Sequence, residues 1–231
     1  MILNRNVSRL EAFSDAIFGF AATLLVVSLD PPASYAALIA NVRGFAAFGV
    51  SFAWLVLLWV AHNAYFRRYE IEDATVIVLN SIFLFVVVFY VYPLRYAANT
   101  AMAFFFGGTL GVGVERLAPS ELATMFALFG AGWTAALGCI ALLHLHAARR
   151  RDALGLDELG AFDAVTAARH YFGYALVGLV SIALALGEVG VTVGAPGWVY
   201  GLMGPISWWN GAARARARAA LAPGDLLVAH G

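Results

Sequence analysis

Long stretches without a charged residue are the feature that most restricts what this chain can fold into. A helix needs about 20 mainly apolar residues to cross the hydrocarbon core of a bilayer. Six segments reach roughly that length when the first is counted from near Arg9: residues 16–29, 44–66, 74–94, 122–148, 170–187 and 189–213. Only 12% of the residues are charged, too few to cover a water-soluble fold of 231 residues. The sequence therefore predicts an all-α, polytopic membrane protein with six transmembrane helices.

The distribution of the basic residues predicts how these helices are oriented. All 14 are arginines, and with a cytoplasmic N-terminus eleven lie inside while three lie outside, namely Arg43, Arg95 and Arg116. A further apolar segment, residues 96–114, would reverse this bias if it crossed the membrane. We therefore expect it to be an outer loop or a continuation of the third helix.

The same bias places both termini in the cytoplasm. The single short set of spans favours a bacterial protein, so we expect a multi-pass protein of the cell (plasma) membrane. Residues 1–213 form the six-span domain, and residues 214–231 form a basic cytoplasmic tail. Arginines in such a tail lie against anionic lipid headgroups, so membrane lipids are expected partners.

Groups that could carry chemistry are scarce. The formal net charge is zero, which gives no reason to expect nucleic acid as a partner. The single cysteine, Cys139, lies in an apolar segment, and the five histidines lack the spacing of a metal or haem site. Motifs of hydrolases, metalloproteases and phosphate-binding loops do not occur. We therefore expect no enzyme, no catalytic residue, no bound metal and no cofactor.

The first span is the most informative segment. On a helical wheel Phe20, Leu24 and Val27 form a narrow apolar stripe, and Phe13 lies in line with it. Asp15 falls on the opposite side of the helix. A charged side chain in a spanning helix is costly unless it pairs or faces water. We therefore expect this end of the helix to turn its polar side toward neighbouring helices.

Polar partners for that side occur on the next two spans. His62 lies near the end of the second span and Asn80 near the start of the third. We expect Ser14, Asp15, His62 and Asn80 to form a buried polar cluster that fixes helix packing. A proton relay or an ion-coordination site made from the same groups is the alternative.

The polar and aromatic residues of the first three spans also form a spaced pattern. It consists of Arg-x-x-x-Phe-Ser-Asp, a threonine, Trp-x-x-His, an asparagine and a proline: Arg9, Phe13, Ser14, Asp15, Thr23, Trp59, His62, Asn80 and Pro93. In these residues the chain resembles the transmembrane-protein-175 potassium channel family, as a bacterial member with a single six-span repeat. The later spans agree with that family in number and topology.

The resemblance implies a non-P-loop channel that is a homotetramer and conducts potassium ions, bound only transiently, through a pore lined by the first helix. It implies a hydrophobic constriction formed by Phe20, Leu24 and Val27. Phe20 stands where the family usually has an aliphatic residue. Thr23 would form a ring of hydroxyls backed by Trp59. The remaining pattern residues would be structural and gating residues: Arg9, Phe13, Ser14, Asp15, His62 and Asn80.

Three other interpretations remain open. Residues 109–113 read Thr-Leu-Gly-Val-Gly, which loosely resembles a potassium filter of backbone carbonyls. A proton- or ion-coupled secondary transporter could use Asp15 and His62, although no internal repeat typical of such carriers is evident. A membrane scaffold without transport activity is the third.

Overall fold

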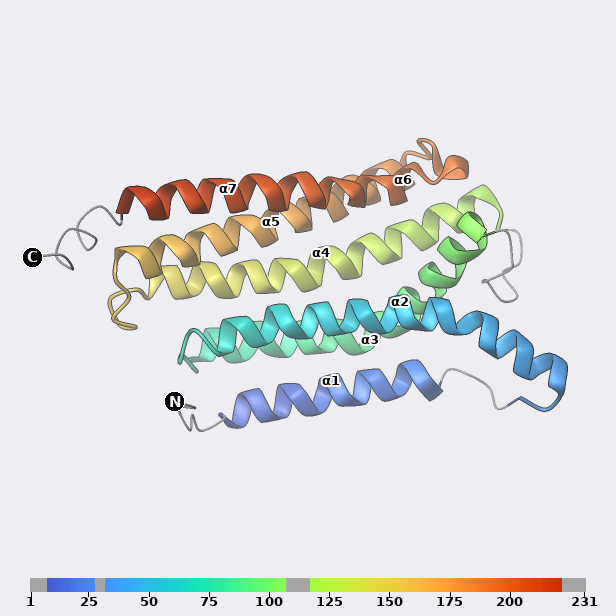
Figure 1. The fold of residues 1–231 in the computed structure, drawn as a ribbon, viewed down its shortest axis with the longest axis horizontal. Helices are drawn as coiled ribbons and strands as arrows, with labels where there is room; N and C mark the ends of the chain where they lie inside the picture. Colours follow the sequence, from blue (N-terminus) through green and yellow to red (C-terminus); the bar gives the residue numbers. More distant parts are fainter. Residues whose placement is uncertain (1–7, 28–31, 107–116, 222–231) are drawn as a thin grey trace, which may run out of the picture.

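The computed structural model describes residues 8–27, 32–106 and 117–221. Over these ranges it contains helices and no strand. In chain order the elements are α1 (Arg9–Val27), α2 (Tyr35–Phe66), α3 (Ala74–Phe106), α4 (Pro119–Arg149), α5 (Glu158–Leu186), η1 (Val191–Val193), α6 (Ala195–Trp198), η2 (Val199–Leu202) and α7 (Met203–Leu221). The long helices lie side by side in an elongated bundle, with the start of α1 and the end of α7 at the same end (Figure 1). The predicted all-α class is confirmed.

The helices α1 to α5 are each long and apolar enough to cross a membrane. They correspond to the first five predicted spans, but α2 and α5 start about ten residues earlier than predicted and α4 starts three residues earlier. The Ser34 side chain accepts a hydrogen bond from the Ala37 amide at 3.1 Å, so α2 begins well before residue 44. The Asp157 side chain accepts from the Gly160 amide at 2.7 Å and starts α5 before residue 170. Polar caps, rather than the limits of the apolar segments, set these helix starts.

The third helix is longer than the apolar segment that predicted it. It runs to Phe106 and includes Pro93, so residues 96–106 continue the helix, as one of the two sequence interpretations expected. Proline removes a backbone hydrogen bond inside a helix and bends it. In Figure 1 the last turns of α3 deviate from the direction of its first part and lead toward the start of α4.

The sixth predicted span is a broken return passage rather than one helix. Residues 189–213 comprise η1, α6, η2 and the first part of α7, which together run back alongside α5 (Figure 1). The breaks have local causes, because Gly190 and Gly194 have left-handed backbones with φ of 62° and 76°. The helix α7 then continues to Leu221, across the predicted boundary at residue 213. The first residues of the predicted tail therefore belong to a helix of the bundle.

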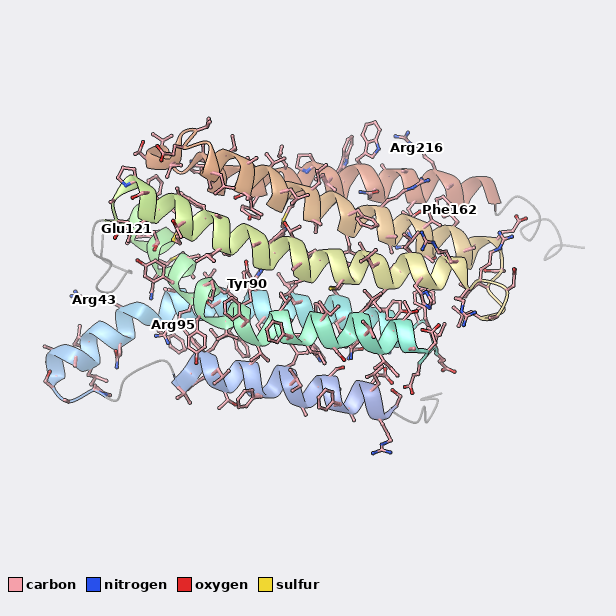
Figure 2. The ribbon with its side chains drawn as sticks, turned by 180° about the vertical axis from the view of Figure 1, so that it is seen from behind. Arg43, Tyr90, Arg95, Glu121, Phe162 and Arg216 are labelled. Carbon is pink, nitrogen blue, oxygen red and sulfur yellow. The ribbon has the colours of Figure 1, made fainter. Side chains whose placement is uncertain are left out.

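Close helix packing in the second half of the bundle depends on glycine. At Gly178 of α5 an added Cβ would lie 2.4 Å from the Thr134 hydroxyl oxygen and 3.1 Å from the Gly130 carbonyl oxygen of α4. A side chain at either glycine would push α4 and α5 apart. At Gly132 the added Cβ would lie only 2.1 Å from the Tyr90 ring, which fills the space between α3 and α4 (Figure 2).

Substitution of Gly132 tests this packing. We expect Gly132→Ala to lower the free energy of unfolding by about 1–3 kcal/mol, because the buried Tyr90 ring must move to admit the methyl group. The matched control is Gly138→Ala in the same helix, where an added Cβ meets nothing within 4 Å. The control should be neutral or slightly stabilising, since alanine is the better helix former. Thermal unfolding of both purified variants measures the difference, and equal stabilities would contradict the packing described.

Candidate functional site in the first three helices

A reciprocal cap starts the helix that carries the site. The Ser8 hydroxyl accepts from the Glu11 amide at 3.1 Å, and the Glu11 carboxylate accepts from the Ser8 amide at the same distance. This capping box satisfies two amides that would otherwise lack partners at the helix N-terminus. The spacing Ser-x-x-Glu was a signal for it that the sequence interpretation overlooked. It fixes where α1 begins and so which side of the helix each following residue occupies.

A chain of buried hydrogen bonds joins α1, α2 and α3. The Asn80 amide donates to the Ser14 hydroxyl at 3.0 Å, and His62 Nε2 donates to the Asn80 carbonyl oxygen at 2.7 Å. All three side chains are at most 2% exposed. The Ser14 hydroxyl in turn donates to the Leu10 carbonyl at 2.8 Å. Three of the four residues predicted for the polar cluster therefore meet, one from each helix.

Aromatic rings enclose the middle of this chain. The Phe83 ring stacks on the His62 ring at 5.1 Å between centroids, and the Phe18 ring lies 5.7 Å away from it. Both phenylalanines are buried. The three hydrogen-bonded side chains therefore sit in apolar surroundings, where an unpaired polar group would be costly. This arrangement suits a group that holds helices together.

Asp15 lies outside this cluster, and the prediction that it belongs to the cluster is wrong. Its side chain is exposed and accepts a hydrogen bond from the Trp59 indole at 2.8 Å. One residue along a helix is a rotation of about 100°, so Asp15 cannot share the direction of the buried Ser14. It points instead to the edge between α1 and α2. There it borders an otherwise apolar groove of about 300 Å³ lined by Phe18, Gly19, Ala22, Phe52, Leu55, Val56 and Trp59.

The predicted apolar stripe lies on the surface of the single chain. Phe13, Phe20 and Val27 are 57%, 54% and 68% exposed. Leu24 departs from the prediction, because it is half-buried and packs partly against the core. Arg9 is exposed, as an arginine at the inner end of this stripe would be.

The hydrogen bonds that Thr23 and Trp59 make in the described part of the chain go to other partners. The Thr23 hydroxyl is exposed and donates to the Gly19 carbonyl of its own helix at 2.9 Å. The Trp59 indole N–H donates its hydrogen bond to the Asp15 carboxylate. A backing role of Trp59 for a hydroxyl ring at Thr23 stays a prediction.

The far end of α1 is held by a residue to which the sequence interpretation gave no role. Arg95 of α3 reaches across and donates from Nη1 to the Leu25 carbonyl at 3.2 Å. The last carbonyls of a helix lack partners within it, and a cation is favourable there. A lone arginine two residues after Pro93 in an apolar segment was the available signal. Its side chain is labelled in Figure 2.

Ion pairs around two carboxylates close the end of the bundle at which α1 starts. Asp163 of α5, 2% exposed, accepts from Arg68 Nη2 and from Arg214 Nε of α7, both at 2.7 Å. A second carboxylate, Asp73, accepts from His146 at 2.7 Å and lies 3.4 Å from Arg150. These pairs tie α4, α5 and α7 to the turn between α2 and α3.

The pKa of Asp73 is lowered by its surroundings at the start of α3. The main cause is the hydrogen bond that its carboxylate accepts from the Val76 amide at 3.0 Å, followed by the bond from His146 and the nearby Arg150. These partners favour the charged carboxylate. The sequence interpretation used the arginines at this end only to orient the chain and missed their acidic partners.

The described part of the chain contains no cluster of histidine, cysteine or carboxylate groups that could hold a metal ion. The Thr-Leu-Gly-Val-Gly segment lies outside the described residues. The inner side of α1 is therefore fixed by hydrogen bonds, and its outer side is apolar and uncovered in the single chain.

Taken together, the helices and this site define a multi-pass membrane protein whose first three helices form one hydrogen-bonded unit. Residues 9–90, which cover that unit, match the family described as the endosomal/lysosomal potassium channel TMEM175. Over these residues the chain is similar to the TMEM175 family.

Individual relatives agree with this similarity. A protein named potassium channel from Marivirga tractuosa is 32% identical over 162 residues, which are 68% of this chain and 65% of that protein. A potassium channel of Streptomyces collinus is 35% identical over 85 residues, or 34% of this chain and 41% of that protein. The matches therefore span less than two thirds of the length of these curated relatives.

Solved structures extend the similarity over nearly the whole fold. The crystal structure of a variant of the potassium channel MtTMEM175, in complex with a nanobody–MBP fusion protein, superposes with a TM-score of 0.78 at 26% identity and covers 94% of this chain and 97% of that one. A TMEM175 homologue from Chamaesiphon minutus, described as a lysosomal potassium-selective channel, has a TM-score of 0.54 at 22% identity. It covers 87% of this chain and 96% of its own, and it supports the fold alone.

Removal of Asn80 tests the hydrogen-bonded unit. Asn80→Ala leaves the buried His62 N–H without its acceptor, so we expect the free energy of unfolding to fall by about 1–3 kcal/mol. The control is Ser81→Ala, because the exposed Ser81 hydroxyl bonds only to the Ile77 carbonyl of its own helix. It should stay within about 0.5 kcal/mol of the wild type. Thermal unfolding in detergent compares the two, and an Asn80→Ala variant as stable as Ser81→Ala would show that the cluster does not hold the helices.

Proposed function

We propose that the chain is a potassium-permeable cation channel that carries passive ion flux through a pore walled by α1 in a homotetramer. The observation that carries the proposal is the orientation of α1. Its buried side is bonded to α2 and α3 through Ser14, while Phe13, Phe20 and Val27 are left uncovered. In several identical subunits such stripes can converge on one axis. The identity of the permeant ion as potassium is inferred from the relatives that are named potassium channels.

The position of Asp15 at the edge of α1 supports a contact between this edge and a neighbouring subunit rather than lipid. A carboxylate exposed within an apolar span is costly in hydrocarbon, and one bond from Trp59 leaves it partly unsatisfied. This edge must therefore face protein or water. A neighbouring subunit on the groove beside Asp15 and Trp59 would cover it and would turn the adjacent stripe toward the common axis.

A pore lined by this stripe would be closed by hydrophobic side chains. A hydrated cation cannot shed its water where nothing replaces the lost hydrogen bonds. Among Phe20, Leu24 and Val27, Phe20 has the bulkiest side chain and would form the narrowest layer of the pore. Leu24, being half-buried, would contribute less than Phe20 and Val27.

The arrangement of polar groups favours passive flux over a coupled carrier. A proton relay through Asp15 and His62 would need them in one hydrogen-bonded chain. In the structure Asp15 is bonded to Trp59, whereas His62 is bonded to Asn80. The family and its relatives are likewise ion channels and not enzymes.

The charge distribution supports cytoplasmic termini for a protein that we place in the plasma membrane. Arg68, Arg150 and Arg214 lie at the end of the bundle where α1 starts and α7 ends, where they pair with Asp163 and Asp73. Arg43 and Arg95 lie toward the other end (Figure 2). More arginines on one side mark that side as cytoplasmic. Arg216, exposed on α7, would meet anionic lipid headgroups there.

Crosslinking tests the position of the first helix in the assembly. The variants Phe20→Cys and Leu25→Cys are made in a Cys139→Ala background. We expect oxidation in membranes to give subunit dimers from Phe20→Cys, because the exposed stripe meets its copies at the axis. Leu25 is fully buried against the chain's own core, so Leu25→Cys should not crosslink. The reverse result would place the axis on another face.

Recording in planar bilayers tests the constriction. Phe20→Ala should raise the conductance and loosen the selectivity for potassium over sodium, because it removes the bulkiest apolar ring. Phe20→Asn should increase the leak further, because its amide offers hydrogen bonds to water. Phe85→Ala is the control, since Phe85 is also exposed but lies on α3. Wild-type current and selectivity in Phe20→Ala, Phe20→Asn and Leu24→Ala alike would exclude this pore.

A further inference from the structure

A cavity of about 400 Å³ lies in the half of the bundle away from the hydrogen-bonded unit. Its walls come from α2, the last turns of α3, the first part of α4, and the segment from η1 to the start of α7. All of these walls lie at the end of the molecule where α3 ends and α6 is found (Figure 1). The cavity belongs to neither the apolar stripe of α1 nor the polar cluster.

The local backbone builds this cavity. Beyond Pro93, α3 deviates from its earlier direction and leads toward the start of α4, and side chains from both segments line the cavity. Between Leu94 and Phe104, the side chains that α3 contributes to the lining are small, with Ala97 and Ala101 among them, so they leave space there. On the opposite wall stand Gly194 and Gly197, which also add no bulk.

The chemistry of the walls excludes water as the occupant. The floor is the stacked pair Trp54 and Trp133, whose ring centroids lie 4.4 Å apart. The Trp133 indole donates to the Tyr174 carbonyl at 2.8 Å, and the Thr100 hydroxyl donates to the Tyr96 carbonyl at 3.0 Å. These two polar atoms are therefore already bonded within the protein, whereas the Trp54 indole nitrogen and the Tyr200 hydroxyl in the same lining are buried without a hydrogen-bond partner. Each buried water needs two to four polar partners, so two isolated polar atoms cannot hold enough water to fill a cavity of about 400 Å³.

An empty space of this size is also unfavourable. Protein interiors are close-packed, and their voids rarely exceed a water molecule, whose share of liquid volume is about 30 Å³. The wall residues would lose dispersion contacts over the whole cavity. Something apolar from the surroundings should therefore fill it.

The rim of the cavity shows where that filling enters. Phe104, Phe105 and Trp198 line the cavity and are 58%, 56% and 59% exposed. The Phe105 and Trp198 rings meet edge to face at 5.5 Å. Tryptophan is favoured at the level where lipid headgroups meet hydrocarbon, whereas the apolar phenylalanine rings suit the adjoining hydrocarbon. In a membrane-spanning bundle an opening between these residues would face the acyl chains of one leaflet.

We propose that this cavity is a lipid site that takes one acyl chain of a phospholipid from the leaflet opposite the termini. The chain enters between the aromatic residues of the rim and reaches the tryptophan floor. Its hydrocarbon replaces the missing packing between α3, α4 and α6, so that the lipid becomes part of the wall of this half of the bundle. The site does not depend on the proposed channel function.

Photolabelling with a modified lipid tests the site. The full chain is placed in vesicles of phosphatidylethanolamine and phosphatidylglycerol that contain a small share of a phospholipid with a diazirine in its acyl chain. After illumination, mass spectrometry locates the label. We expect it on Met125 and Trp133, which line the cavity and are only 9% and 3% exposed. Label on the exposed Phe85 serves as the measure of insertion into the bilayer.

A matched pair of substitutions separates the cavity from the outer surface. Ala101→Phe fills the cavity and should reduce the label on Met125 and Trp133 severalfold while leaving Phe85 labelled. Ala103→Phe adds the same ring to the same helix at a residue that does not line the cavity, and it should leave all three labelled.

Three results would overturn the proposal. Label on Phe85 with none on Met125 and Trp133 in the unmodified chain would show that no acyl chain enters. Undiminished label on the cavity residues in Ala101→Phe would show that they are reached by another route. Protein–protein crosslinks at the rim in place of lipid label would show that a second copy covers the opening.

Discussion

The bond from Asn80 to Ser14, continued to His62, is the interaction on which the rest of the site depends. In a bilayer there is no hydrophobic force to press one apolar helix against another, so packing and interhelical hydrogen bonds must hold them. This chain uses one residue from each of α1, α2 and α3, all nearly inaccessible. With that side of α1 fixed, its rotation is fixed too. The stripe at Phe20 is outward because Ser14 is inward.

The ends of the helices are secured by a different means from their middles. Within the bundle the bonds are between neutral groups, as at Asn80. Near the two ends, arginines make the bonds between helices. Arg95 donates to the last turn of α1, and Arg214 pairs with the buried Asp163. Arginine can extend its guanidinium from an apolar stem toward water, so it suits positions at the edge of the membrane. If one partner of a buried ion pair is removed, the other charge stays buried without compensation, which destabilises the fold.

Much of this architecture could be predicted from the sequence, because hydrophobic length and arginine bias are one-dimensional signals. Five of the six predicted spans followed from them, with the continuation of α3 beyond residue 94 as one of two alternatives. The meeting of Ser14, His62 and Asn80 followed instead from the cost of polar groups in spanning helices. What could not be predicted depends on direction in space. Asp15 and Ser14 are neighbours in sequence, but one step of the helix turns Asp15 to Trp59. The break in the sixth passage likewise depends on the left-handed backbones at Gly190 and Gly194, which hydropathy does not report.

Adjacent residues of one motif thus serve two different surfaces. Ser14 binds α1 to its own subunit, whereas Asp15 lies at an edge that the single chain leaves open. In water an open carboxylate would need no further explanation, but beside an apolar groove in a membrane it does. Under the proposed assembly a second copy covers that groove, and the same rotation of α1 that buries Ser14 brings the stripe at Phe20 to the axis. Folding of the subunit and formation of the pore would then be set by one helix orientation.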